Sequence, residues 1–206
     1  MRKGERTRQR ILEVAEAAIL QKGFGATSIE EVVAEAEITK SGFLYHFPDK
    51  NRLALALLER HLEKDDAILD DIWARAGELS DDPLQRFLIG LKLFAELLED
   101  MPGGHPGCLV ATICYQERLF NAEIHALNRK TVLGWRTRFR GILDEISELY
   151  TPVEPVDMDA LADMVSTIVE GGIVMAKALT EPSQLPRQIL LFRSYVKLLF
   201  RPKIGN

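Results

Sequence analysis

The sequence predicts an all-α protein of about nine helices, with a small N-terminal head of three helices and a larger helical domain behind it. Two observations carry this prediction. Apolar residues recur at helical spacing along most of the chain, and no segment shows the alternating pattern of a strand. Proline, glycine and capping residues separate these helical segments. We place the boundary between this head (residues 1–49) and the second domain (residues 50–206) before the fourth helix.

The composition is ordinary for a globular protein, with 47% hydrophobic and 28% charged residues. No apolar run approaches the roughly 18 residues that span a bilayer, and no apolar segment of a secretory signal follows the N-terminus. We therefore expect a cytoplasmic protein without a membrane partner. Two cysteines are too few for a disulfide framework, and the histidines match no metal-binding spacing, so no metal and no cofactor are expected.

The charge is distributed unevenly. The net charge is −5, yet residues 1–10 contain five basic side chains against the single acid Glu5. Residues 1–50 contain eight basic and eight acidic side chains, so the remaining 156 residues carry the whole net charge. Nucleic-acid binding requires a basic face rather than a basic protein, so this balance does not exclude it. A solvated N-terminal arm is the alternative interpretation.

The first helix is predicted over residues 5–22 and ends at Gly23, a residue type typical of helix C-termini. Its buried stripe comprises Ile11, Leu12, Ala15, Ala18 and Ile19. Thr27 and Glu30 have the spacing of a capping box, which predicts the start of the second helix. The apolar face of this helix comprises Ile29, Val32, Val33 and Ala36.

The third helix is predicted from the capping residue Thr39 to Tyr45, and Pro48 prevents its continuation. Only residues 36–38 remain for the turn between the second and third helices. Two short helices joined in this way form a helix-turn-helix unit, whose second helix lies in the major groove of DNA.

Six further helices complete the prediction. The first of them begins after Asp49, the next begins at Asp82-Pro83 with a cap and an N1 proline, and Asp157 caps a later one. Their predicted ranges are 50–77, 83–99, 108–118, 122–150, 157–179 and 185–200.

The N-terminal part resembles the TetR family of bacterial transcriptional regulators. The resemblance covers residues 6 to about 60, through R-I-L-E-V-A-E-A-A-I-L-Q-K-G-F-G-A-T-S and L-Y-H-F-P-D-K-N-R-L; further on, helix lengths and P-G-C-L-V at 106–110 agree. It implies a dimer that forms through a four-helix bundle of the last two helices, and a helical domain that holds a small-molecule effector. It also implies that Tyr45 and Lys50 contact phosphates.

The predicted partner is double-stranded operator DNA. Thr39, Lys40 and Ser41 lie where base edges are met first, and lysine can donate to guanine O6 or N7. Gly42 would permit close approach to the duplex or to the first helix. The predicted phosphate contacts are Tyr45, His46 and Lys50, with a second anchor at Thr27 and Ser28. The alternative is that Tyr45 packs in the core and Lys40 is solvated.

Two residues depart from the family pattern. Glu37 stands in the turn where glycine is common, and a left-handed conformation there would cost about 1–2 kcal/mol for a residue with a side chain. Phe43 stands where a smaller residue is frequent, and it either stacks on a sugar or thymine methyl or fills the core.

The last two helices have more apolar surface than one core face requires, which favours homodimerisation through them over a monomer. The residues are Met164, Ile168, Gly171, Gly172, Val174, Met175, Ala178, Ile189, Phe192, Tyr195, Val196, Leu199 and Phe200. The candidate wall of a hydrophobic effector pocket comprises Phe87, Leu91, Phe94, Ile113, Trp135, Phe139, Ile168 and Met175, with core packing as the alternative.

Cys108 is a candidate sensor thiol, because it should lie in the first turn of a helix, where the helix dipole lowers the pKa of a thiol. A small buried cysteine is the alternative. We interpret the chain as a dimeric repressor that a small hydrophobic or aromatic effector, or thiol modification, releases from a palindromic operator. The alternatives are a small helical enzyme or binding protein with a hydrophobic pocket, and an activator or nucleoid protein without an effector.

Overall fold

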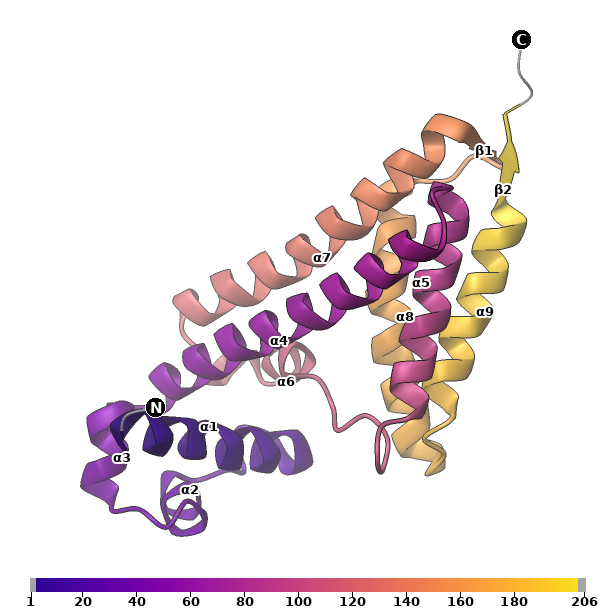
Figure 1. Ribbon diagram of the computed structural model, residues 1–206. Helices are drawn as coiled ribbons and strands as arrows, with labels where there is room; N and C mark the ends of the chain where they lie inside the picture. The colour runs from indigo at the N-terminus through magenta and orange to yellow at the C-terminus, as the bar shows by residue number, and fades with distance from the viewer. Residues whose placement is uncertain (1–2, 204–206) are drawn as a thin grey trace. The chain divides into compact units, whose positions relative to one another are not determined.

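The computed structural model describes residues 3–203, which form nine α-helices, one 3₁₀ turn and two short strands (Figure 1). The helices are α1 (Lys3–Lys22), α2 (Ile29–Glu35), α3 (Lys40–His46), α4 (Lys50–Leu79), α5 (Pro83–Glu99), α6 (Leu109–Tyr115), α7 (Ala122–Leu149), α8 (Met158–Leu179) and α9 (Gln184–Leu199). The 3₁₀ turn η1 is Glu117–Leu119, and the strands are β1 (Tyr150–Pro152) and β2 (Phe200–Pro202). The all-α prediction is confirmed. Of the basic N-terminal residues, Arg2 lies outside the described range.

The chain forms two compact units. The first contains residues 3–65 and Pro106–Thr131, and the second contains Asp66–His105 and residues 132–203. The predicted head therefore lies in a unit that also includes α6, η1 and the first turns of α7. The functional division after residue 49 stays a prediction. In the described range, no helix is both long and apolar enough to cross a membrane.

In the first unit, α2 and α3 form the predicted helix-turn-helix. Four of the five residues of the predicted α1 stripe are buried, namely Ile11, Leu12, Ala15 and Ile19, and Ala18 is partly exposed. Thr39 caps α3 as predicted, and its hydroxyl accepts a hydrogen bond from the Gly42 amide at 3.1 Å. The cap of α2 was predicted one residue too early, because Ser28 rather than Thr27 accepts from the Glu31 amide.

The turn between α2 and α3 contains a left-handed residue where the sequence suggested one. Glu37 has φ of 56°, a conformation that costs a residue with a side chain about 1–2 kcal/mol. We expect Glu37→Gly to raise the free energy of unfolding by about 0.5–1 kcal/mol, since glycine relieves this strain but loses more entropy on folding. Urea unfolding followed by circular dichroism measures the change.

Glu35→Gly is the matched control for that substitution. Glu35 ends α2 in helical conformation, so glycine there should lower the free energy of unfolding by about 0.5–1 kcal/mol. We expect glycine to raise the free energy of unfolding at position 37 and to lower it at position 35. Destabilisation by both variants would show that Glu37 is not strained.

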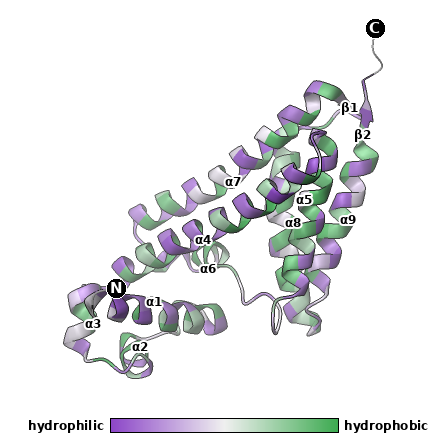
Figure 2. Ribbon diagram, viewed as in Figure 1, coloured by the Kyte–Doolittle hydropathy of each residue, from purple (hydrophilic) through white to green (hydrophobic). Residues whose placement is uncertain are grey.

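In the second unit, α5, α8 and α9 run side by side, and hydrophobic residues recur along each of them (Figures 1 and 2). Asp82 and Asp157 cap α5 and α8 as predicted, accepting from the amides of Gln85 and of Asp159 and Ala160. The rings of Phe87 and Phe192 meet edge to face, with centroids 6.4 Å apart. This ring contact joins the buried faces of α5 and α9.

The strand pair was not predicted. β1 and β2 pair antiparallel, with Tyr150 opposite Pro202 and Pro152 opposite Phe200. Each strand has three residues, which is too short for an alternating pattern to be visible in a sequence. The Tyr150 hydroxyl donates to Asp82 at 2.7 Å, and this hydrogen bond raises the pKa of Tyr150. The pairing thus ties the end of α7 to the end of α9.

The segment predicted as one helix over residues 108–118 is divided. α6 ends at Tyr115, Gln116 leaves the helical conformation with φ of −122° and ψ of 34°, and η1 follows. The Gln116 side-chain oxygen accepts a hydrogen bond from the Gly25 amide at 2.9 Å. This contact with a residue 91 positions away could not be read from local sequence.

Candidate DNA-binding interface

Helix α3 has one buried and one exposed face. Phe43 lies on the buried face, and Phe47, the C-terminal cap residue, packs near it with ring centroids 5.9 Å apart. The exposed face contains Lys40, Ser41, Leu44 and Tyr45. The Tyr45 side chain is 83% exposed and that of Lys40 is 62% exposed. The helix therefore presents a cation, hydroxyls and an aromatic ring away from its own core.

Phe43 was a candidate DNA contact, and the structure corrects this. Phe43 is 0% exposed, so in the folded head its ring cannot reach a sugar or a thymine methyl. Its role is to hold α3 on the core of the first unit. Nearby, the guanidinium of Arg8 lies 5.3 Å from the centroid of the Phe47 ring, a cation–π contact that joins α1 to the end of α3.

Thr27 is also corrected. It is 2% exposed, and its hydroxyl donates to the Gly23 carbonyl at 3.0 Å, so it stabilises the link between α1 and α2 and cannot reach a phosphate. Its neighbour Ser28 is exposed at the start of α2. The second phosphate anchor therefore reduces to Ser28 and the amides of the first turn of α2.

Lys50 also contacts other residues of the first unit. Its ammonium donates to the carbonyls of Phe24 (3.0 Å) and Thr27 (2.7 Å) and lies 4.8 Å from the Phe24 ring centroid. Burial lowers the pKa of this ammonium. In this structure Lys50 fastens the start of α4 to the α1–α2 link, and its phosphate contact stays a prediction.

The remaining predicted contacts lie around the exposed face of α3. Thr39 and Ser41 are exposed, and their hydroxyl oxygens lie 3.1 Å apart. Gly42 and His46 are partly exposed, and the His46 ring meets Tyr45 edge-on with centroids 5.0 Å apart. A Cβ at Gly42 would contact only Thr39 at 3.2 Å, so its glycine is not required for packing against α1.

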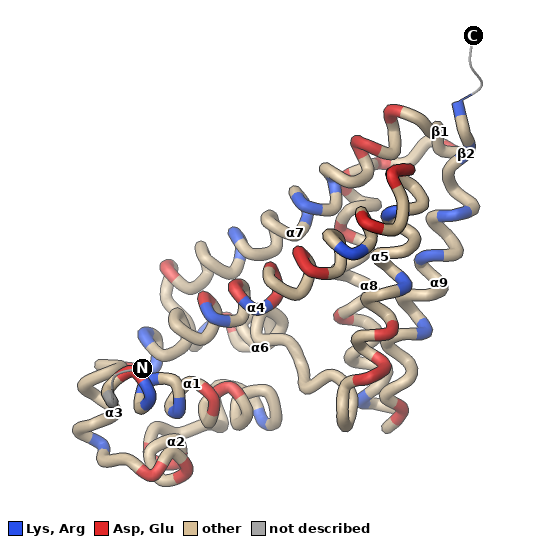
Figure 3. The backbone as a smooth tube through the Cα atoms, in the orientation of Figure 1, with Lys and Arg blue, Asp and Glu red and all other residues tan. Residues whose placement is uncertain are grey.

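Ion pairs connect α2 to its neighbours. Glu30 accepts from the Lys40 ammonium at 2.8 Å, and Glu31 accepts from that of Lys22 at 2.5 Å. The hydrogen bond from the lysine is the main cause that lowers the pKa of each glutamate. Figure 3 shows the acidic residues on α2 and the basic residues near the start of α1. In this arrangement Lys40 has a carboxylate partner on the preceding helix.

Two residues of this region were missed from the sequence. Leu44 is exposed one turn after Lys40 and Ser41, and its i+4 spacing from Lys40 could have identified it. Glu30 was interpreted only as part of a capping box. No local signal pairs it with Lys40, because the two are ten positions apart and meet across the turn.

The candidate effector residues occupy different environments. Phe87, Leu91 and Phe139 are buried in the second unit, and Phe94, Trp135 and Ile168 are partly exposed there. Met175 is 46% exposed on α8, and its role as an effector contact stays a prediction.

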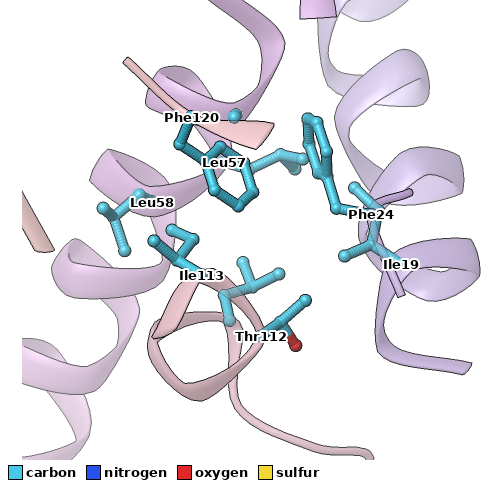
Figure 4. Close-up of a pocket in the computed structure, with 9 residues that line it drawn as sticks. Ile19, Phe24, Leu57, Leu58, Thr112, Ile113 and Phe120 are labelled. Atoms are coloured by element: carbon cyan, nitrogen blue, oxygen red, sulfur yellow. The ribbon is translucent and has the colours of Figure 1, made fainter. Parts of the chain in front are cut away.

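Ile113 lines a cavity of the first unit. Side chains of α1, α4 and α6 point toward one another around it, including Ile19, Leu57 and Ile113 (Figure 4). The cavity volume is ≈ 10 Å³, which is about the space of one water molecule. In this conformation it has no room for an effector.

Cys108 stands one position earlier than predicted. It is the N-cap residue of α6 rather than part of its first turn, and it is partly exposed. Cys114 is exposed, and its sulfur accepts from the Asn128 side-chain amide at 3.4 Å. A sensor role for Cys108 stays a prediction.

Comparisons with known proteins agree with this geometry. The family described as "Bacterial regulatory proteins, tetR family" matches residues 11–57. The transcriptional regulator AcuR of Cereibacter sphaeroides is 26% identical over 170 residues, which are 81% of this chain and 74% of AcuR. The transcriptional repressor NemR of Escherichia coli is 36% identical over 55 residues, which are 27% of this chain and 28% of NemR.

A TetR-family regulator from Agrobacterium tumefaciens has the same fold, with a TM-score of 0.78 over 97% of this chain and 100% of that one, at 16% identity. The matched segment, residues 11–57, contains α2, α3 and the exposed face that α3 presents. The chain therefore contains a TetR-family DNA-binding region at residues 11–57, and it is a DNA-binding transcriptional regulator.

Proposed function

We propose that this protein is a homodimeric, effector-responsive repressor that binds a palindromic operator in the cytoplasm. The observation that carries the proposal is the exposed face of α3, where Lys40, Ser41, Leu44 and Tyr45 point away from the core. Lysine and serine can donate to base edges, leucine can contact a thymine methyl, and a tyrosine hydroxyl can donate to phosphate. Relatives named as repressors, such as NemR, support repression over activation.

The proposed dimer interface is an exposed stripe on α8 and α9. On α8 it contains Gly171, Val174, Met175 and Ala178, and on α9 it contains Leu191, Tyr195 and Leu198. The apolar α9 residues Ile189, Phe192, Val196 and Leu199, together with Phe200, were predicted to face a partner, but they are buried in the core of this chain. Leu191, Tyr195 and Leu198 repeat at i, i+4 and i+7, so they form one face that a second copy can cover.

Effector binding and DNA release must be linked by a difference in affinity between two states of the dimer. A coupling of about 1–3 kcal/mol would weaken operator binding roughly 5- to 150-fold. The candidate effector residues of the second unit are Phe87, Leu91, Phe94, Trp135, Phe139 and Ile168. Release by modification of Cys108 is a second route that alkylation of the thiol can test. The enzyme alternative has no support from the relatives, which are named as transcriptional regulators.

Lys40→Ala tests the assignment of the exposed face. The probe is the duplex most enriched when wild-type protein selects from random-sequence DNA, and the measurement is fluorescence anisotropy. A lysine contact to guanine is worth about 1–3 kcal/mol, so we expect affinity for this duplex to fall roughly 5- to 150-fold. The variant should also lose the preference for one base pair over the others at one position of each half-site.

Lys22→Ala is the matched control, because Lys22 belongs to the same unit and also pairs with a glutamate of α2. It removes the same charge from a position outside α3. It should therefore leave base discrimination unchanged and alter affinity only through the general electrostatic attraction. Equal base preferences for the two variants would contradict the assignment of α3 as the reading helix.

A further inference from the structure

The cation at the start of α3 has an acidic partner. The Lys40 ammonium lies 2.8 Å from Glu30 Oε1, and the two side chains are 62% and 68% exposed. Glu30 lies in the first turn of α2, so this contact crosses the turn of the helix-turn-helix unit. An exposed pair of this kind adds little to stability. The pair does orient the Lys40 side chain, and the Glu30 carboxylate partly offsets the positive charge of the ammonium.

The same helix provides an internal comparison. Glu31, next in sequence, pairs with Lys22 at the end of α1, at 2.5 Å. Glu30 and Glu31 share the first turn of α2, and a lysine lowers the pKa of each. They differ in one respect that bears on DNA, which is that only the partner of Glu30 lies on the exposed face of α3.

We propose that Glu30 is a specificity-determining residue, which pairs with Lys40 in the DNA-free protein so that Lys40 favours guanine over the phosphate backbone. This inference rests on the proposed function, in which the exposed face of α3 reads the operator. On this inference, the lysine exchanges its carboxylate partner for an acceptor on DNA when the operator is bound. An acceptor on DNA must therefore interact with Lys40 more favourably than Glu30 does.

The physical reason lies in how the two kinds of DNA attract a lysine. Non-specific binding comes almost entirely from protein cations that neutralise DNA phosphates and release the counterions condensed around them. A lysine already paired with a carboxylate contributes less to that attraction, and the carboxylate itself repels phosphate. Guanine offers two acceptors, O6 and N7, at its edge in the major groove. Phosphate oxygens are the same at every base pair, so contacts with them carry no sequence information. Glu30 therefore weakens binding to random DNA more than binding to the operator.

Glu30→Gln and Glu31→Gln, each in the full-length protein, test the inference. Two duplexes are titrated by fluorescence anisotropy at equal ionic strength: the one most enriched by selection with wild-type protein, and a scrambled duplex of the same composition. For Glu30→Gln we expect both affinities to rise and the scrambled duplex to gain more. The ratio of the two affinities should fall about 3- to 5-fold, the size of one exposed ion pair.

Glu31→Gln removes the same charge from the same turn and should leave that ratio within about 2-fold of the wild-type value. A third variant, Glu30→Gln with Lys40→Ala, should show the ratio of Lys40→Ala alone, because Glu30 acts through Lys40. If Glu30→Gln and Glu31→Gln change the ratio equally, Glu30 is an ordinary surface acid and the inference is overturned.

The outcomes separate this inference from the proposed function. If the wild-type protein enriches no sequence, or if Lys40→Ala leaves the ratio unchanged, the assignment of α3 as the reading helix fails and the inference fails with it. If Lys40→Ala lowers the ratio but the two glutamine variants coincide, only the inference about Glu30 fails. Circular dichroism of each variant checks that the helices remain folded.

Discussion

A Leu191→Glu variant is expected to be monomeric and to bind the selected duplex at least about 100-fold more weakly than the wild-type protein. Leu191 is 65% exposed on α9, within the proposed interface stripe with Tyr195 and Leu198. A carboxylate there would be buried without a partner at a C2 interface, and the symmetry brings two of them into the same contact. Sedimentation equilibrium measures the mass, and anisotropy measures the affinity.

The affinity falls because a monomer carries one reading helix. In a dimer, binding of the first helix places the second near its half-site, and this intramolecular step multiplies the affinity about 10²- to 10⁴-fold. Leu79→Glu is the matched control, since Leu79 ends α4 and is also 65% exposed but lies outside the stripe. A dimeric Leu191→Glu protein, or a monomeric Leu79→Glu protein, would place the interface elsewhere.

Gly90→Ala is expected to lower the free energy of unfolding by about 3 kcal/mol. Gly90 is buried on α5, and a Cβ there would lie 1.5 Å from Cζ3 and 2.1 Å from Cε3 of Trp73. The indole would have to leave its site, where it meets Phe87 and Phe139 edge to face at 6.0 and 6.2 Å. Each such aromatic contact contributes about 0.5–1.5 kcal/mol beyond the area that it buries.

Gly141→Ala is the control for that prediction. Gly141 lies in α7, in the same unit, and no atom lies within 4 Å of the Cβ that alanine would add. Alanine is the better helix former, so this variant should gain about 1 kcal/mol. Adding Trp73→Leu to Gly90→Ala should recover part of the lost stability, because the smaller side chain vacates the overlapping space. Thermal unfolding by circular dichroism ranks all three variants, and a stable Gly90→Ala protein would mean that Trp73 has another site.

Local sequence was sufficient for most of the helices. Caps such as Asp82, Asp157 and Thr39 act through hydrogen bonds to amides two or three residues ahead, so their effect is visible in a short window. The strained turn residue was recognised for the same reason, since Glu37 stands where the chain must reverse within a few residues. The short strands β1 and β2 were not predicted, because within residues 3–203 each pairs with the other, about 50 positions away in the sequence.

The candidate site was predicted in outline and corrected in detail. The motif placed the two helices and their turn correctly, and Lys40, Ser41 and Tyr45 are exposed as a DNA contact requires. Phe43 and Thr27 had the right residue types and the right neighbourhood but are buried. A motif states which residues are near one another along the chain, whereas exposure depends on which side of α3 the rest of the unit covers.

The sequence by itself determined that the chain has an all-α fold and that its N-terminal part contains a helix-turn-helix, because these depend on periodicity and capping over short distances. Only the tertiary structure decided which side chains are available. It showed that Ile189, Phe192 and Val196 fill the core while Leu191 and Leu198 remain exposed, and that Glu30 holds Lys40. Apolar residues on a helix are chemically alike in sequence, and packing against other helices is what separates core from surface.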